Sequence, residues 1–250
     1  AIQAYRDFLA KYPSSKLVPN AYYWIGKSAG NLKKTSEAVS NFNSVINGWL
    51  KSDIGLSAAI ELANIYSAQK NYSSAVRVLN SATDAIPTSN RVPELLYMKG
   101  VAETNNNQQQ DAYQTFDQIV KYYETSVFSD KAKVELGIIE LNRNNLERAQ
   151  TLFRELGEKR VDDIGAEAQY YYGLTLFKQN KIDDAVSALV RVRSIFAGYD
   201  EWYSKSLIAL GDCYVKLKDK KQAREMYREV IERHQTGELA QEAKRKLRQL

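Results

Sequence analysis

The chain has 250 residues, of which 44% are hydrophobic and 26% are charged, and its formal net charge is +5. These proportions are typical of a globular protein. Only 4 prolines and 12 glycines are present, which is few for a β-rich protein with many turns. No stretch approaches the roughly 18 consecutive apolar residues of a membrane-spanning helix, so we predict no transmembrane segment.

The chain offers few groups for catalysis or metal binding. Cys213 is the only cysteine and His234 the only histidine, which excludes an internal disulfide and a cysteine-based metal cage. We expect Cys213 to be buried in an apolar helix and His234 to be solvated or to cap a polar helix end. The sequence has no phosphate-binding glycine loop and no metal-ligand spacing. We therefore predict no catalytic residues, no metal, no cofactor and no enzymatic activity.

The positive charge is confined to the C-terminal end. Residues 214–250 contain 11 Lys and Arg against 6 Asp and Glu, whereas the remaining residues are balanced. Because Lys and Arg alternate with Glu at helical spacing, we interpret this stretch as solvated helix faces with i,i+4 pairs. A nucleic-acid or membrane-surface patch is the alternative. We expect no nucleic-acid partner.

An internal repeat organises the whole chain, and its period is about 37 residues. An alanine recurs at intervals of 36 to 38 residues, namely Ala1, Ala38, Ala75, Ala112, Ala149, Ala185 and Ala223. A bulky residue follows each alanine by four positions: Tyr5, Phe42, Leu79, Phe116, Phe153, Leu189 and Tyr227. A small residue precedes each alanine but the first by 12 positions: Gly26, Ala63, Gly100, Gly137, Gly173 and Gly211.

Each repeat is predicted to form two helices joined by a short polar turn, because apolar residues recur at spacings of three and four. The first helix carries the small residue, and the second helix runs from the alanine, which we expect to pack into the gap beside the small residue. Asn and Lys in the turns suit the left-handed conformation. The predicted units are a half repeat at 1–13, repeats at 19–50, 56–87, 93–124, 130–160, 166–197 and 204–235, and a capping helix at 237–250.

These registers resemble the tetratricopeptide repeat (TPR) family, whose pattern includes L-G, a following tyrosine, A-x3-F and a proline. Leu136-Gly137 and Leu210-Gly211 match the L-G step, Ala112 and Phe116 match A-x3-F, and Pro13 matches the proline. The resemblance implies an all-α, right-handed solenoid over residues 1–250. Two features depart from the pattern. The period is longer than the 34 residues of the family, and the first-helix tryptophan is replaced by Tyr22, Ala59, Leu96 and Lys133.

The links between repeats resemble those of one subgroup of TPR proteins. KYPSSKLVPNAYYWIG, at residues 11–26, and the closing residues 229–250 are similar to the links and last helices of bacterial envelope TPR proteins. Those proteins include the Tol–Pal-associated coordinator and the outer-membrane-assembly lipoprotein. This similarity implies a bacterial periplasm or envelope, and the cytoplasm is the alternative.

In a TPR-like stack the first helices line a concave groove that binds a protein or peptide. Three positions should face it: three residues before the small residue, one after it and four after it. We expect the groove residues to be Tyr23, Lys27, Asn64, Tyr97, Val101, Val134, Ile138, Tyr170, Leu174 and Phe177. Two interpretations remain open for this apolar face: it binds an amphipathic helix or extended peptide, or other parts of the chain already cover it.

The first residues suggest a second possibility. Ala1, Tyr5, Phe8 and Pro13 occupy second-helix positions, so the chain is expected to enter halfway through a repeat and to begin with an uncapped edge. The function predicted first is a non-enzymatic protein-interaction scaffold. The alternative is a self-association module of a longer TPR chain, which would use this N-terminal edge.

Overall fold

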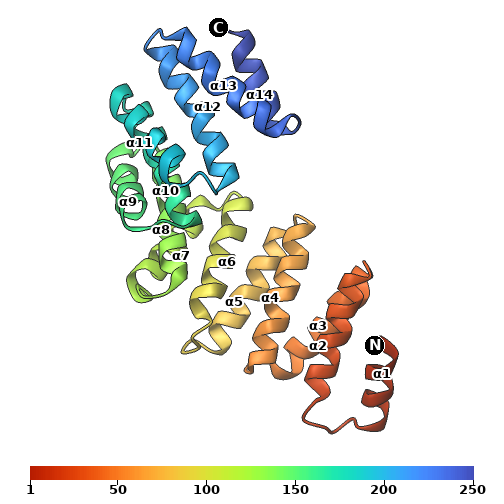
Figure 1. The fold of residues 1–250 in the computed structure, drawn as a ribbon. Coiled ribbons are helices and arrows are strands. Elements are labelled where there is room, and N and C mark those ends of the chain that lie inside the picture. The colour runs from red at the N-terminus through yellow and green to blue at the C-terminus, as the bar shows by residue number, and fades with distance from the viewer. The chain divides into compact units, whose positions relative to one another are not determined.

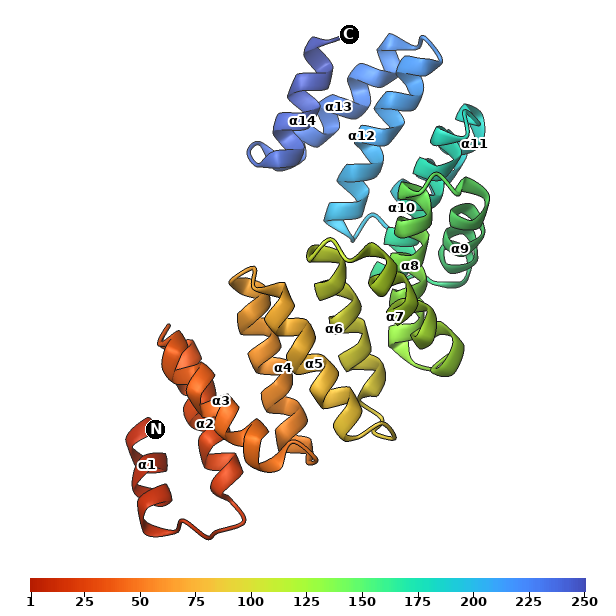
Figure 2. The same ribbon diagram turned by 180° about the vertical axis from the view of Figure 1, so that it is seen from behind.

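The computed structural model describes residues 1–250, and all of its regular structure is α-helical (Figure 1). The helices of the N-terminal part are α1 (Ile2–Lys11), α2 (Val18–Asn31), α3 (Thr35–Trp49), α4 (Asp53–Ala68), α5 (Tyr72–Ala85), α6 (Val92–Asn105) and α7 (Gln109–Tyr122). Those that follow are α8 (Val127–Asn142), α9 (Leu146–Lys159), α10 (Asp163–Lys178), α11 (Ile182–Ile195), α12 (Asp200–Lys216), α13 (Lys220–His234) and α14 (Glu238–Arg248). Figure 2 shows the same helices from behind.

The helices alternate as first and second members of antiparallel pairs, from α2 and α3 to α12 and α13. Several begin earlier than the repeat pattern predicts, and the reason is local capping. The Ser52 side chain accepts a hydrogen bond from the Gly55 amide, so α4 begins at Asp53. Asp162 does the same for Gly165 at the start of α10. The second helices also begin one turn before the repeating alanine, as α3 does at Thr35.

The turns inside the pairs share one conformation. Each places a single residue in the left-handed region, with φ between 58° and 63° at Lys33, Lys70, Asn107, Asn144, Asn180 and Lys218. Every one of these residues is Lys or Asn, as the sequence predicted. Asn reaches this region at little cost, whereas Lys must be held there by the surrounding turn.

Where the two helices of a pair cross, the small residue lies beneath the bulky side chain that follows the alanine by four positions. A Cβ added to Gly100 would lie 2.6 Å from Phe116 Cε1, and one added to Gly211 would lie 2.3 Å from Tyr227 Cε1. The prediction that the alanine fills this gap is therefore wrong. The glycine makes room for the ring, because the ring is too large to share the crossing with a methyl group.

The chain divides into two compact units, Ala1–Phe128 and Ser129–Leu250. The core of unit 1 includes Phe42, Leu62 and Leu79, and the core of unit 2 includes Phe153 and Leu189. None of the helices is long and apolar enough to span a membrane.

Candidate functional site

We call the surface formed by the first helices, which includes the positions predicted to face the groove, the inner face of each unit. In unit 1 these helices are α2, α4 and α6, and in unit 2 they are α8, α10, α12 and α14. Unit 1 carries Tyr23, Lys27, Asn64, Tyr97 and Val101, and unit 2 carries the other five predicted groove residues.

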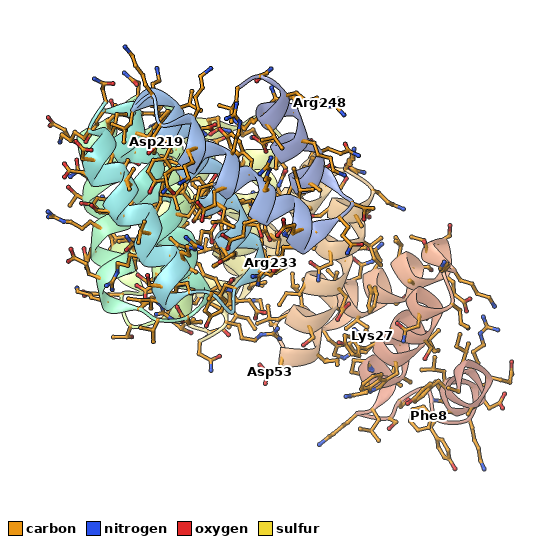
Figure 3. The ribbon with its side chains drawn as sticks, turned by 45° about the horizontal axis from the view of Figure 1, so that its top comes forward. Phe8, Lys27, Asp53, Asp219, Arg233 and Arg248 are labelled. Atoms are coloured by element: carbon orange, nitrogen blue, oxygen red, sulfur yellow. The ribbon has the colours of Figure 1, made fainter.

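A charged pair crosses the inner face of unit 1. Lys27 Nζ on α2 (Figure 3) lies 2.7 Å from Glu61 Oε1 on α4, and both side chains are partly exposed. The hydrogen bond to Glu61 raises the pKa of Lys27. The Tyr23 ring packs against Phe42 with its centroid 5.8 Å away, and burial raises the pKa of the Tyr23 hydroxyl. Lys27 is thus engaged within the chain rather than free for a ligand.

The remaining candidates of unit 1 lie in different surroundings. Asn64 is exposed, and Val101 is half-buried. Tyr97 is half-buried between two rings, with its centroid 5.9 Å from Phe116 and 5.7 Å from Phe128. The accessible part of this inner face is consequently a mixture of polar groups and ring edges rather than a continuous apolar strip.

Unit 2 covers part of its predicted groove by itself. Val134 retains only 2% exposure and is therefore closed to a ligand. Leu174 and Phe177 pack against the buried cluster that includes Leu207 and Ile208, and Ile138 packs against the cluster around Phe153. The contacts of Leu174 and Phe177 arise because the first helices α10 and α12 pack directly on one another. Within unit 2, much of the predicted apolar groove is packed against neighbouring repeats.

Aromatic side chains nevertheless gather beside this packed region. The Tyr170 centroid lies 5.1 Å from that of Tyr171 and 5.8 Å from that of Trp202, while Tyr171 stacks on Phe153 at 5.3 Å. Both tyrosine side chains are half-buried. Burial raises the pKa of both hydroxyls, to about 12 in Tyr171. At neutral pH both hydroxyls are therefore protonated and able to donate.

Carboxylates surround one edge of these rings. Glu167 is half-buried on α10, and its pKa is raised to about 7, first by burial and then by the negative charges of Glu135 and Asp163. Lys205 opposes this effect with its positive charge. Its Nζ lies 4.3 Å from the centre of the Trp202 ring, an arrangement typical of a cation–π contact. The edge thus combines aromatic rings with Glu167, whose raised pKa shows that its negative charge is not fully compensated.

A second ion pair closes the far end of unit 2. Lys246 Nζ on α14 lies 2.7 Å from Asp212 Oδ2 on α12, and the Tyr227 hydroxyl donates to Asp212 Oδ1 at 2.7 Å. Asp212 and Lys246 are 34 residues apart, the same separation as Lys27 and Glu61, with the charges reversed. In both units, then, an ion pair between residues 34 positions apart connects one first helix to the next.

Several of these residues escaped the sequence analysis. Glu61, Glu167, Tyr171 and Lys205 occupy first-helix positions two or six residues before the repeated small residue, which the three predicted groove positions did not include. A wider set of first-helix registers would have selected them. Their charge environment would still have been missed, since it depends on residues from neighbouring helices.

The single cysteine and histidine do not form a site. Cys213 is fully buried, and burial raises the pKa of its thiol to about 12. His234 lies in the last turn of α13 with its Nε2 2.7 Å from Ser204 Oγ. The predicted burial of Cys213 is confirmed, and His234 is bonded to a hydroxyl rather than fully solvated. No group of three or more His, Cys, Asp or Glu residues is arranged to hold a metal ion.

Comparison with known proteins identifies the class of this chain. Two models of the tetratricopeptide repeat match residues 134–196 and 166–236, and a model described as the outer membrane lipoprotein YfiO matches residues 16–151. Together with the paired helices, these matches define a TPR protein. Because residues 16–151 make up more than half of the chain, the chain belongs to the YfiO family of outer membrane lipoproteins. The comparison with curated proteins gave no match.

Solved structures with the same fold are distant in sequence. A TPR protein from Parabacteroides merdae ATCC 43184 is 19% identical with a TM-score of 0.65, and the match covers 99% of this chain and 90% of that one. The structure of pilF from Pseudomonas aeruginosa is 15% identical with a TM-score of 0.66, and the match covers 91% of this chain and 97% of that one. YrrB is a TPR protein described as having an unusual peptide-binding site. It is 18% identical with a TM-score of 0.54, and the match covers 82% of this chain and 97% of that one. Identities this low show a shared TPR solenoid fold, and proteins of this fold generally serve as protein-interaction scaffolds.

Proposed function

We propose that this chain is a non-enzymatic scaffold that binds a protein or peptide segment on the inner face of its repeats. In unit 2 the contact surface is formed by Glu167, Tyr170, Tyr171 and Lys205, which lie beside the buried Trp202. The YfiO match supports placing this scaffold in the bacterial envelope. YrrB, whose description names a peptide-binding site, offers a precedent for peptide binding by this fold.

The observation that carries the proposal is the hydrogen-bonding state of Tyr170 and Tyr171. Their rings are packed among aromatic neighbours, yet neither hydroxyl bonds to another group of the chain. Rigid aromatic side chains with a free polar end are enriched at protein interfaces, because they bury a large area at a small entropy cost. A peptide backbone laid across the two rings would supply acceptors for both hydroxyls.

The carboxylates beside the rings indicate the chemistry of the ligand. Glu167 is destabilised as an anion by burial and by Glu135 and Asp163. A cationic side chain entering there would relieve this repulsion. We therefore expect the ligand to carry Lys or Arg next to an apolar or aromatic residue.

Site-specific photocrosslinking tests this proposal. A photoreactive phenylalanine analogue at position 170, in the full chain expressed in bacterial cells, should give a discrete adduct with another polypeptide. The matched control is the same analogue at position 122, because Tyr122 is 75% exposed and lies on a second helix. Glu167→Gln should weaken adduct formation at position 170. Adducts of equal yield at both positions, or no adduct at position 170, would exclude the inner face of unit 2 as the binding surface.

The second candidate function is self-association through α1. This helix has no fully buried residue although it carries Ile2, Tyr5 and Phe8, so an apolar edge is available to another copy. Self-association through α1 predicts that the molar mass measured by light scattering rises with protein concentration. A mass that stays monomeric across the concentration range would argue against it.

A further inference from the structure

The turn between α12 and α13 concentrates exposed lysines that the structure leaves unpaired. Lys216, Lys218 and Lys221 are exposed, and none of them makes an ion pair or a hydrogen bond within the chain. Lys220 donates from Nζ to the Leu250 carbonyl at 2.6 Å. The only acidic residue of the turn is Asp219 (Figure 3), and its side chain is occupied in capping α13 through the Gln222 amide.

The links between the repeats of unit 2 differ from this turn, because their cations are paired with carboxylates. On the links between repeats, Arg160 pairs with Asp130 and Asp162, and Arg233 pairs with Asp200. The first turns of α9 and α11 also carry acidic residues, whereas the first turn of α13 carries none. Positive charge is thus neutralised along the links and left uncompensated at the α12–α13 turn.

An exposed leucine lies within the same turn. Leu217, the C-cap of α12, is 44% exposed between Lys216 and Lys218. The corresponding turn of unit 1 repeats this arrangement, since Leu32 caps α2 with 62% exposure and is followed by exposed Lys33. In each unit, then, an exposed leucine lies beside lysines in a turn, and the lysine that follows the leucine, Lys33 or Lys218, has a positive φ.

We infer that the α12–α13 turn binds the surface of a bilayer that contains anionic phospholipid. The lysines lie at the level of the phosphates, and Leu217 inserts between the headgroups. Clusters of four or more cations next to an apolar group are the usual features of such surfaces.

Two properties of the turn favour a lipid surface over an acidic protein. All four cations are lysines, and lysine is depleted in protein–protein interfaces, where arginine is enriched because its planar fork matches a carboxylate. Residues 216–221 also contain no aromatic side chain on which a protein or peptide ligand could pack. Nucleic acid would call for stacking rings among the cations, and this turn contains none.

Vesicle flotation with the full chain tests the inference. Vesicles of phosphatidylcholine with phosphatidylglycerol should bind the protein at low ionic strength, and pure phosphatidylcholine vesicles should not. Binding should fall several-fold when the salt is raised from about 50 to 300 mM, because the Debye length shortens. Lys216→Gln/Lys218→Gln/Lys221→Gln should weaken binding about tenfold or more, in line with the loss of three surface cations.

The matched control removes three other exposed and unpaired cations, Lys16→Gln/Lys51→Gln/Arg154→Gln, which changes the net charge equally. It should alter vesicle binding less than about twofold. Leu217→Ser should reduce the part of the binding that survives high salt, and circular dichroism should show both triple variants to be folded. Absent binding of the unmodified chain, equal loss in both triple variants, or binding to polyglutamate or an oligonucleotide instead of vesicles would overturn the inference.

Discussion

The ring of Phe116 on α7 lies against Gly100 on α6 so closely that a Cβ on Gly100 would come within 2.6 Å of Phe116 Cε1. Phe116 is fully buried, so its ring has no free space into which to move. The same relationship joins Gly137 to Phe153 in unit 2. The crossings of α6 with α7 and of α8 with α9 are therefore fixed by the absence of one methyl group, whereas α4 carries Ala63 at the same position.

This relationship predicts that Gly100→Ala destabilises the chain despite the better helix propensity of alanine. Overpacking of a close-packed crossing should lower the free energy of unfolding by about 1–3 kcal/mol. The measurement is urea unfolding followed by circular dichroism. Gly48→Ala is the matched control, because Gly48 lies on α3 with nothing within 4 Å of its added Cβ. That substitution should be neutral or stabilising by up to about 1 kcal/mol, and an equal loss in both variants would contradict the steric explanation.

The ion pair between Lys27 and Glu61 should contribute little to stability. Both side chains are about a third exposed, at 34% and 28%, so solvent screens the attraction. A double-mutant cycle with Lys27→Met and Glu61→Gln should give a coupling energy of about 0.2–1 kcal/mol. The coupling should shrink in about 1 M salt, where the Debye length falls to about 3 Å. A coupling that does not respond to salt would show that packing, rather than charge, joins α2 to α4.

Glu167 should make the stability of unit 2 dependent on pH. Its pKa is raised to about 7 in the folded chain, above the ordinary value of 4.5. The folded state therefore binds this proton more tightly than the unfolded state. The stabilisation is complete below pH 4.5 and is lost as the pH rises through 7.

Removing the charge should abolish this dependence. Glu167→Gln should raise the free energy of unfolding at pH 8 by about 1–2 kcal/mol, a range that allows for screening of the half-buried carboxylate. At pH 4 the variant should match the unmodified chain. Chemical unfolding at both pH values measures the difference. Glu158→Gln serves as a control, since Glu158 is exposed, and an equal pH response in both variants would contradict the assignment to Glu167.

Cys213 should resist thiol reagents in the folded chain. It is fully buried on α12, and the raised pKa of about 12 leaves almost no thiolate at neutral pH. Because it is the only cysteine, the rate of reaction with an aromatic disulfide reports on one position. Labelling should be slow in buffer and fast in urea. Rapid labelling under native conditions would show that α12 opens away from its neighbours.

Much of the architecture could be predicted from the sequence. The recurrence of Gly100, Ala112 and Phe116 at fixed spacing located the helix pairs, and the Lys and Asn residues of the turns indicated left-handed positions. These features depend on near neighbours in the chain and on residues of a single pair. They repeat through the sequence, so the pattern could be read without knowing how the pairs pack together.

The candidate site could be predicted only in part. Tyr170 and Lys27 lie on first helices, but the sequence could not show that Val134 is buried or that Lys27 is paired with Glu61. Exposure and pairing depend on side chains about 34 residues apart, brought together when one repeat packs on the next. The unusual pKa of Glu167 likewise arises from carboxylates on neighbouring first helices.

The sequence by itself therefore determined the repeat, the helical class and the recurring small and bulky residues, because these follow from local periodicity and side-chain size. Only the tertiary structure decided which apolar residues remain accessible and which charges stay unpaired. Leu174 is partly covered by the packing of α10 on α12, whereas Lys216 and Lys218 are left without a partner. The physical reason is that burial and electrostatic pairing belong to the stack of repeats rather than to any one repeat.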